Sequence, residues 1–580
     1  MRISYFLGIR EPETHFLDVS VTIEGYPEEI LQLTMPAWTP GSYTIRDFAR
    51  NVRNMRARTN GTVLDMSKKD KSTWKVVTGR KSPVTVEYEV YADEAFPQTS
   101  HVDASHAFIT GTSVFVYLEG YREQTVELTI EKPDGWRIST ALDRITDNRY
   151  RATNYDILVD SPIEIGTHET LSFRVDGRDH EIALYGDFMG SREKLLQDVS
   201  SIVEAAQRIM GQLPYRRYLF IFHAIREFVT PYVGLEHAHS TAINFESGFL
   251  EDEKSYKTCL SVISHEFFHL WNVKRIRPTE LVEPGFREEV YTHGLWFSEG
   301  VTDYYANILI LRAGLITTQE FLDKMASEIS SYRMTPGRRY YSAAESSFDS
   351  WIKYYRSSTG TVNSYVDYYL KGLLLGLMLS TEIINASRGS KSLDDLMRNM
   401  MEKYRRDGRG FSEKDLLQAL REISGTDMTD WFRMYVKGRD EIPFESMLSS
   451  VGLILEKKPL KDGRRSTGLV LRKSGGKFLV SAVHEGTSSY EAGINAGDEL
   501  VAAGGIRFNE KMTGTPVRER ILQDLFQGGG EHVNLHVFRN GRIMEFQVKL
   551  PADPFETYAL RESEENDERK NSMRAKLLSG

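Results

Sequence analysis

Residues 261–273, SVISHEFFHLWNV, decide how the rest of the chain is organised. Within them His265, Glu266 and His269 have the spacing H-E-x-x-H. Residues four apart in a helix lie on one face, one turn apart. His265 and His269 can therefore present two imidazole nitrogens to one cation, with the Glu266 carboxylate beside them. We expect a helix that carries two metal ligands and a general base.

The flanks of this motif predict that the helix is buried. Apolar side chains surround it nearly all round, at Val262, Ile263, Phe267, Phe268, Leu270 and Trp271. Two histidines and a glutamate in such a helix need polar partners, because burying unpaired polar groups is costly. A metal ion supplies those partners, and H-E-x-x-H on a helix is the arrangement found in zinc peptidases.

A zinc peptidase needs three protein ligands and an open position for water, so a third donor is required. The segment 296–305, WFSEGVTDYY, predicts a second helix after a loop. Glu299 in this segment is the best candidate for the third ligand. The alternative is that Glu299 is an ordinary surface glutamate.

Length and composition describe a multidomain protein. At about 150 residues per domain, 580 residues suggest three or four units. The net charge of −9 is spread along the chain, and no basic stretch with interleaved aromatic residues occurs, which disfavours nucleic-acid binding. The longest apolar run, 373–379, is too short for a membrane span, so we expect no membrane partner. Cys259 is the sole cysteine, and we expect a cytoplasmic protein.

The N-terminal part, residues 1–177, reads as β structure. Apolar and polar residues alternate at 17–24, 84–90 and 126–130, which is the period of strands with one buried face. We expect an antiparallel β-sandwich here and a mainly helical catalytic domain at 178–447, so that the whole is an α+β protein. The segment 35–43, MPAWTPGSY, is a shaped loop, either a structural turn or a rim of the active site.

Four stretches together resemble the glycyl aminopeptidase family of zinc metallopeptidases. They are the loop at 35–43, the segment GLEH at 234–237, HEFFHLWNVKRIRP at 265–278, and 296–305. The resemblance implies a thermolysin-like catalytic domain with one zinc ion, held by His265, His269 and Glu299, and with Glu266 as the base. It also implies a substrate-binding role for Gly234 and Glu236, with Glu236 meeting the N-terminal ammonium of the substrate.

The segment 369–372, YLKG, resembles the Tyr-x-Lys-Gly stretch of the related larger aminopeptidases. In those enzymes the tyrosine stabilises the oxyanion of the tetrahedral intermediate, so the resemblance favours Tyr369 for this role. Tyr365 and Tyr368 lie close enough in sequence to be alternatives.

The C-terminal part, residues 448–555, reads as a small β module. The segment 478–501 resembles PDZ domains, in which a strand, a short helix and an A-G-h-x-x-G-D turn follow in order. A helix is expected at 517–526, and Asn540-Gly541 predicts a type I′ hairpin. Such a module would bind a peptide or protein ligand as an added strand, or serve packing or substrate presentation. Residues 556–580 are dense in charge, and we expect a solvated tail.

The sequence therefore predicts a zinc aminopeptidase that removes a small N-terminal residue, glycine or alanine by the resemblance, from peptide substrates. One alternative is a zinc endopeptidase that binds extended chains, with Glu236 in a structural role. Another is a catalytically silent scaffold that recruits partners through the PDZ-like module. The complete set of ligands and base argues against a scaffold, which has no need of Glu266.

Overall fold

The computed structural model describes residues 1–226, 228, 230–459, 467–507, 531–551 and 556–580. The chain forms two compact units. The first comprises residues 1–292, 305–316 and 397–412, and the second comprises residues 293–304, 317–396 and 413–580. Within the described part of the chain, no helix has the length and apolar character needed to cross a membrane.

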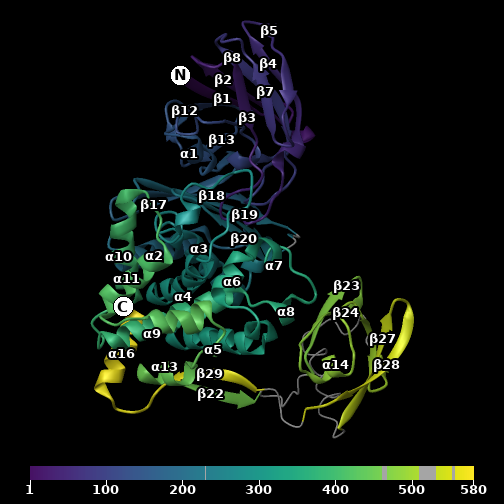
Figure 1. The fold of residues 1–580 in the computed structure, drawn as a ribbon, viewed down its shortest axis with the longest axis vertical. Helices are drawn as coiled ribbons and strands as arrows, with labels where there is room; N and C mark the ends of the chain where they lie inside the picture. Colours follow the sequence, from purple (N-terminus) through teal and green to yellow (C-terminus); the bar gives the residue numbers. More distant parts are fainter. Residues whose placement is uncertain (227, 229, 460–466, 508–530, 552–555) are drawn as a thin grey trace. The chain divides into compact units, whose positions relative to one another are not determined.

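The first unit begins with three β-sheets, as expected for the N-terminal part (Figure 1). The largest has the strand order β14 (Asp143–Arg144), β15 (Arg149–Ala152), β12 (Val126–Glu131), β1 (Arg2–Gly8), β2 (Phe16–Glu24), β8 (Val84–Tyr91), β4 (Val52–Thr59) and β5 (Thr62–Val63). Along β2 the apolar residues face the core and the polar ones alternate outward. The pairs are antiparallel except β1 with β12, which run parallel, so the expected antiparallel pattern is incomplete.

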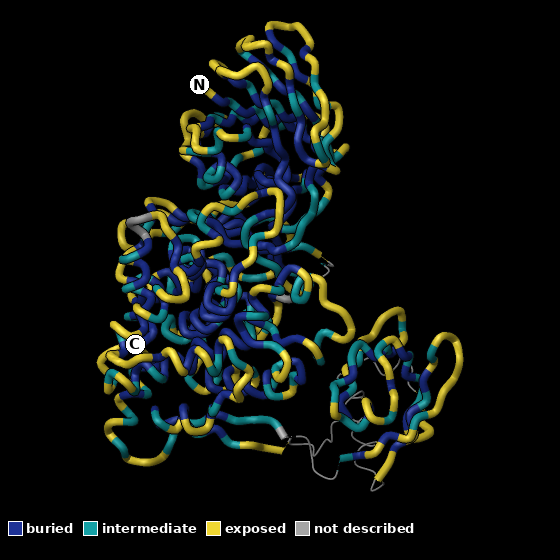
Figure 2. Tube along the Cα trace, in the orientation of Figure 1, coloured by how far each residue is buried: buried dark blue, intermediate teal, exposed yellow. Residues whose placement is uncertain are grey.

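Two four-stranded sheets complete the N-terminal part. One has the order β13 (Arg137–Thr140), β16 (Ile163–Gly166), β10 (His106–Ile109), β9 (His101–Val102). The other has the order β11 (Tyr117–Leu118), β3 (Ile30–Thr34), β7 (Thr73–Val77), β6 (Met66–Lys68). The apolar side chains of all three sheets form one cluster of buried residues. Figure 2 shows such buried residues gathered in the interior.

A further sheet of the first unit precedes the metal-site helix. Its order is β17 (Glu169–Val175), β18 (Arg178–Gly186), β19 (Arg217–Ile225), β21 (Ser240–Glu246), β20 (Tyr232–Glu236). Strand β19 pairs on both sides and is buried over most of its length, and apolar side chains fill most of it, as is typical of a central strand. Helices α2 (Arg192–Met210) and α3 (Glu253–Phe268) pack on each other, and α3 also packs on β20.

The second unit is mainly helical. Its central element is α9 (Tyr368–Ala386), which is buried along most of its length. A π-helical turn, η6 (Trp296–Val301), packs closely against α9. A Cβ added to either Gly300 or Gly372 would overlap the backbone of the other element, so both positions require glycine.

The expectation of a solvated tail at 556–580 is wrong. Strand β29 (Glu556–Glu562) pairs with β22 (Leu453–Pro459), and α16 (Glu568–Ser579) contacts α9. Helix α16 buries Met573, Leu577 and Leu578. These three apolar residues are spaced to lie on one helix face, and the high charge density around them obscured that face in the sequence.

Between β22 and β29 the chain forms a C-terminal sheet module. Its strands are β23 (Leu469–Ser474), β24 (Lys477–Val483), β25 (Glu499–Ala503), β27 (His532–Arg539) and β28 (Arg542–Lys549), with β26 (Ile506–Arg507) paired to β25. Asn540 and Gly541 both have positive φ, as a type I′ turn requires, so the hairpin prediction is confirmed. The helix expected at 517–526 lies outside the described residues.

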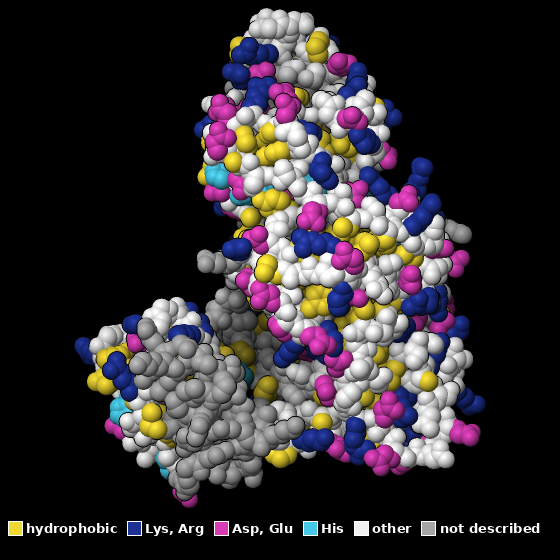
Figure 3. Space-filling view, turned by 180° about the vertical axis from the view of Figure 1, so that it is seen from behind, with side chains coloured by type: hydrophobic (Ala, Val, Ile, Leu, Met, Phe, Trp, Pro, Cys, Tyr) yellow, Lys and Arg dark blue, Asp and Glu magenta, His cyan; other side chains and the backbone are white. Residues whose placement is uncertain are grey.

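Surface charge is mixed on the face drawn in Figure 3. Lys and Arg side chains are interspersed there with Asp and Glu. On that face the charges therefore form no extended positive field of the kind that attracts a nucleic-acid backbone.

Candidate active site

Helix α3 positions the first half of the site. Asp252 caps its N-terminus by accepting hydrogen bonds from the backbone N–H groups of Lys254 and Ser255, 3.0 Å from each. Of the apolar residues expected to be buried in this helix, Ile263, Phe267 and Phe268 are buried and Val262 is half-buried. His265 and Glu266 lie in its last turn, and His269 is the residue that ends it.

The two histidines of the motif face each other. Their Nε2 atoms lie 2.8 Å apart. His269 Nδ1 is 2.7 Å from the backbone carbonyl of Asn272, to which it must donate, so Nε2 of a neutral His269 carries a lone pair. His269 is buried, whereas His265 keeps a partly exposed edge. Two ring nitrogens at this separation, with one fixed as an acceptor, fit a shared cation.

Glu299 comes to this pair from the π-helical turn η6. It is buried, and one of its carboxylate oxygens lies within 4.8 Å of a ring nitrogen of both His265 and His269. A π-turn widens the helix by one residue and is frequent at functional sites. The structure thus brings together the three residues expected as ligands, and their two imidazoles and one carboxylate suit zinc.

Glu266 packs against strand β20 at Gly234, where the strand carries no side chain. A Cβ added to Gly234 would overlap the Glu266 carboxylate, so the absence of a side chain at this position makes room for the base. Glu236, at the end of the same strand, has a carboxylate oxygen within 4.8 Å of ligand atoms of Glu266 and His269. The two glutamates and Gly234 are therefore neighbours in one site.

The loop at 35–43 contacts Glu236. This contact favours the interpretation that the loop is a rim of the active site over the alternative that it is only a structural turn. A Cβ on Gly41 would lie 2.6 Å and 2.7 Å from the two Glu236 carboxylate oxygens. Trp38 fixes the loop by donating to the carbonyl of Gly285 at 2.9 Å. Gln98 holds β20 from the same side, since its Nε2 donates to the carbonyl of Gly234 at 3.1 Å. Gln98 could not be predicted as part of the site, because no motif in the sequence around it marks it.

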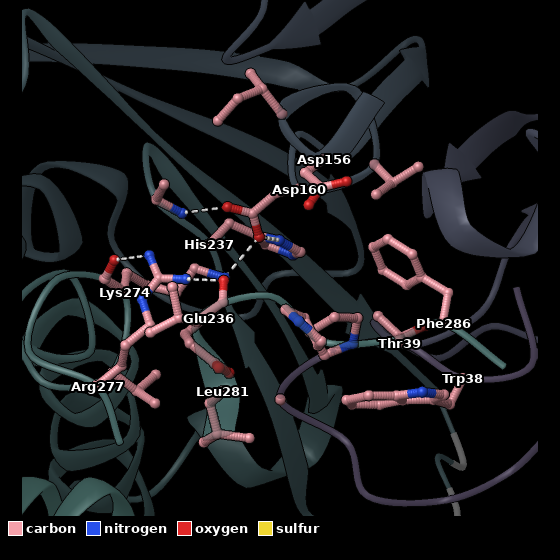
Figure 4. A pocket seen from close by; sticks show the side chains of 18 of the residues that line it. Trp38, Thr39, Asp156, Asp160, Glu236, His237, Lys274, Arg277, Leu281 and Phe286 are labelled. Carbon is pink, nitrogen blue, oxygen red and sulfur yellow. Dashed lines mark hydrogen bonds and ion pairs between the residues drawn. The ribbon is translucent and has the colours of Figure 1, made fainter. Parts of the chain in front are cut away.

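A cavity of about 210 Å³ adjoins Glu236 (Figure 4). Its lining is largely apolar and includes Trp38, Tyr43, Ile157, Leu281 and Phe286. A charged cluster lies in one wall: Asp160 is 2.7 Å from Lys274 Nζ and 3.1 Å from His237 Nδ1. Although burial alone would raise it, the Lys274 ammonium and the hydrogen bond with His237 hold the pKa of Asp160 well below its usual range. His237 thus has a structural partner in this wall.

Tyr369 lies in the first turn of α9, where Asp367 caps the helix by accepting from the Tyr369 backbone N–H at 2.8 Å. Its ring stacks on Tyr354 with centroids 5.1 Å apart. Burial raises the pKa of Tyr369 well above its usual value, and among the charges that raise it further Glu299 has the largest effect. A tyrosine that stays protonated next to a ligand carboxylate can act as a hydrogen-bond donor in the site.

Comparisons with known proteins agree with this geometry. Residues 4–167 match the model of the peptidase M61 N-terminal domain, and residues 258–375 match that of the M61 glycyl aminopeptidases. The chain carries both domains of the M61 glycyl aminopeptidase family. It is therefore a metallopeptidase, and the group of His265, His269 and Glu299, which could hold a metal ion, lies within the residues that match the M61 domain.

Solved structures resemble this M61 chain. An aminopeptidase N family protein from Idiomarina loihiensis matches with a TM-score of 0.91 and 27% identity, over 98% of this chain and 100% of that one. An M1 zinc metallopeptidase from Deinococcus radiodurans matches with a TM-score of 0.46 and 14% identity, over 76% of this chain and 95% of that one. No curated protein sequence matches the chain.

Proposed function

We propose that the chain is a zinc-dependent aminopeptidase that hydrolyses the N-terminal peptide bond of peptides. His265, His269 and Glu299 would hold one zinc ion at this site. When bound, zinc supplies Lewis-acid chemistry: it lowers the pKa of water toward about 7 and polarises the scissile carbonyl. The remaining steps fall to side chains of the chain itself.

Glu266 serves as the general base. Its carboxylate lies beside the metal-binding histidines and faces the space left by Gly234. There it takes a proton from the attacking water and returns it to the leaving amine, which then departs as the shortened peptide. Tyr369 donates a hydrogen bond to the carbonyl oxygen as negative charge develops on it.

In this proposal Glu236 makes the enzyme an exopeptidase by binding the substrate's N-terminal ammonium. The observation that carries the proposal is the position of the Glu236 carboxylate. Its buried carboxylate lies within 4.8 Å of ligand atoms of Glu266 and His269, which is about one residue's length from the reacting carbonyl. A free N-terminal ammonium placed there makes a charge-assisted hydrogen bond, whereas a blocked amine cannot make this contact.

The test compares glycyl amide with N-acetylglycyl amide while the zinc content of the purified protein is measured. We expect hydrolysis of the free amine to exceed that of the blocked one by a factor of a hundred or more, about 3 kcal/mol for one buried charged contact. Glu236→Gln should remove most of this preference. Equal rates on both substrates would favour the zinc endopeptidase, with Glu236 in a structural role.

The residue preference is a narrower part of the proposal. The family resemblance favours glycine or alanine as the first residue. The cavity of about 210 Å³ beside Glu236 has room for a larger side chain, so leucyl amide belongs in the substrate panel. A higher kcat/KM for leucyl amide than for glycyl amide would contradict the preference and leave the aminopeptidase proposal standing.

We also propose that the C-terminal sheet module is similar to PDZ domains. The order of strand β24, short helix α14 (Ser488–Glu491) and strand β25 supports this proposal. A peptide or protein ligand of the module would add as a strand at its open edge. A silent scaffold would have no use for Glu266 beside the metal ligands, so a lack of hydrolysis by the zinc-loaded protein is what would favour that alternative.

A further inference from the structure

A second group of metal-ligating side chains lies in the first unit, apart from the site of α3. His106 begins β10, Glu164 is on β16 and His223 is on β19. In the pairing of β10 with β16, His106 lies opposite Gly166, and Glu164 is two residues from that position on the same face. A Cβ on Gly166 would lie 2.7 Å from the Cβ of His106, so glycine leaves this face open for the imidazole.

The three side chains are buried and meet at the Glu164 carboxylate. His106 Nδ1 lies 3.1 Å from Oε1, and His223 Nε2 lies 2.9 Å from Oε2. The relative exposure of Glu164 is 0%, that of His223 is 3% and that of His106 is 6%.

The hydrogen bonds around His223 fix which of its nitrogens carries the proton. Its Nδ1 is 3.0 Å from Oδ1 of Asn244, and Nδ2 of Asn244 donates to the carbonyl of Ala95 at 2.8 Å. The amide oxygen must therefore accept from His223 Nδ1. In the neutral ring, Nε2 then carries a lone pair that faces the Glu164 carboxylate.

His168 repeats this arrangement from the chain just after β16. Its Nε2 is 3.0 Å from Ser139 Oγ, and the Ser139 hydroxyl donates to Glu181 at 2.6 Å, so Oγ accepts from His168. In the neutral ring, His168 Nδ1 therefore also carries a lone pair. It is buried, has no hydrogen-bond partner in the described structure, and lies 3.9 Å from Glu164 Oε1.

Two imidazole lone pairs that face a buried carboxylate need a proton or a cation between them. One proton on an imidazole satisfies only one of the two nitrogens, whereas one cation satisfies both. The nitrogens of His223, His106 and His168 lie 2.9, 3.1 and 3.9 Å from a Glu164 oxygen, which is Oε2 for His223 and Oε1 for the other two. Ligand atoms of His106, Glu164 and His223 all lie within 4.8 Å of one another, a spacing compatible with one cation and bonds of about 2.0–2.1 Å. The outer N–H groups of His223 and His168 are held by oxygen atoms, as second-sphere partners hold ligating histidines.

We propose that His106, Glu164 and His223, with His168 as a fourth donor, bind a structural divalent cation of the zinc class. Four protein ligands leave no position for water, which distinguishes a structural site from a catalytic one. The ion would join β19 to β10 and β16, and thus fasten the N-terminal domain to the sheet that carries Glu236. This site is independent of the proposed peptidase function.

The first test is the zinc content of the purified full-length protein, dialysed after loading with zinc. We expect about two ions per chain, and about one in His106→Gln. The matched control is His180→Gln, a buried histidine bonded to the Tyr215 hydroxyl at 2.7 Å and outside the cluster; it should keep both ions. Equal zinc in His106→Gln and the unmodified protein would overturn the proposal.

His269→Gln separates this site from the peptidase site. It should lose the ion of α3 and keep the one at Glu164. A protein whose single zinc is lost in His106→Gln and kept in His269→Gln would support this proposal and count against the proposed function.

If His106→Gln does not fold, diffraction from crystals of the unmodified protein grown with zinc decides the question. Data collected at the zinc absorption edge should show an anomalous peak about 2.0–2.2 Å from Glu164, His106 and His223. A map without a peak there would overturn the proposal, whatever it shows at His265 and His269.

Discussion

At the scale of single residues, the chemistry depends on Glu266 lying beside the proposed metal ligands, in the space that Gly234 leaves. Its neighbours in the site, His269 and Glu236, come from the end of α3 and the end of β20. Glu266 is not required to hold the ion, because the ligand set is complete without it. The base and the metal can therefore be separated by substitution.

Glu266→Gln should keep the metal and lose turnover. The amide fills the same space but cannot accept the proton of the attacking water, so kcat should fall by a factor of roughly thousands. Zinc content and glycyl amide hydrolysis measured on the same preparation check this. Turnover within tenfold of the unmodified enzyme would remove Glu266 from the mechanism.

Gly234→Ala should have a similar effect by another route. The added methyl group would overlap the Glu266 carboxylate and push it from its place, so we expect a loss of at least a hundredfold in kcat with the zinc retained. Gly360→Ala is the control, since the nearest atom to a Cβ there is 4.0 Å away. Full activity in Gly234→Ala would show that Glu266 does not need this position.

Site residues can be predicted from the sequence when they contact neighbours a few positions away in the chain. Contacts between distant segments are harder to predict. The H-E-x-x-H spacing is contained in one helical turn, so the metal pair and the base could be predicted directly. Glu299 required an additional rule, the need for a third ligand. The fit of Glu266 against Gly234 and the meeting of His106, Glu164 and His223 depend on which strands become neighbours, and no spacing in the sequence encodes that.

At the scale of elements, α9 supports the second half of the site. It carries Tyr369 in its first turn, and at Gly372 it lies against Gly300, next to the ligand Glu299. Lys371, which lies between Tyr369 and Gly372 in the sequence, is fully buried, and its Nζ has no hydrogen-bond partner among the described residues. A buried, unpaired ammonium destabilises the fold unless it loses its charge.

Lys371 should make stability rise with pH in the alkaline range. Burial lowers the pKa of its ammonium from the usual 10.5 to about 8. Between these values the unfolded chain binds more protons than the folded protein, so the free energy of unfolding increases as pH rises from about 8 to 10.5. Lys371→Met removes this increase, and at pH 7 it should stabilise the protein by on the order of 2–3 kcal/mol.

Thermal unfolding of Lys371→Met and the unmodified protein at pH 7, 8, 9 and 10 measures this difference. The exposed Lys81→Met serves as the control for the loss of a positive charge. A gap in Tm that stays constant across this range would show that Lys371 does not titrate there. The gap should instead narrow as pH rises.

Helices and strands whose apolar residues recur with one clear period could be predicted. Pairings with segments far away in the sequence could not. The alternation in β2 and the apolar helix α3 follow from spacing alone. The parallel pairing of β1 with β12 was missed because strand direction in a sheet is set by the connections between strands. Helix α16 was missed because three apolar residues among many charges give a weak signal.

At the scale of the whole molecule, the C-terminal sheet module is an insertion into a pair of strands. Pro459 at the end of β22 lies opposite Glu556 at the start of β29 in the antiparallel register. The two ends that flank the module are thus adjacent, as they are in a hairpin. The module boundaries expected from composition, 448 and 555, do not reveal this, because β22 falls inside them and its partner outside.

Replacing residues 460–555 by an Asn-Gly turn should leave a folded enzyme. The turn closes β22 onto β29 without changing their register, so hydrolysis of glycyl amide should stay within about twofold of the full chain. Any function of the module should show only with longer peptides. A folded variant that no longer cleaves glycyl amide would mean that the module contributes to the site.

The same insertion fixes an order of events during synthesis. Strand β29 and helix α16 leave the ribosome after the whole module, yet they pair with β22 and contact α9, the helix that carries Tyr369. Until both have been synthesised, β22 lacks its partner strand and the part of α9 that contacts α16 stays uncovered. A nonsense codon at position 556 would spare His265, His269 and Glu299, yet its product would lack β29 and α16 and be open to degradation.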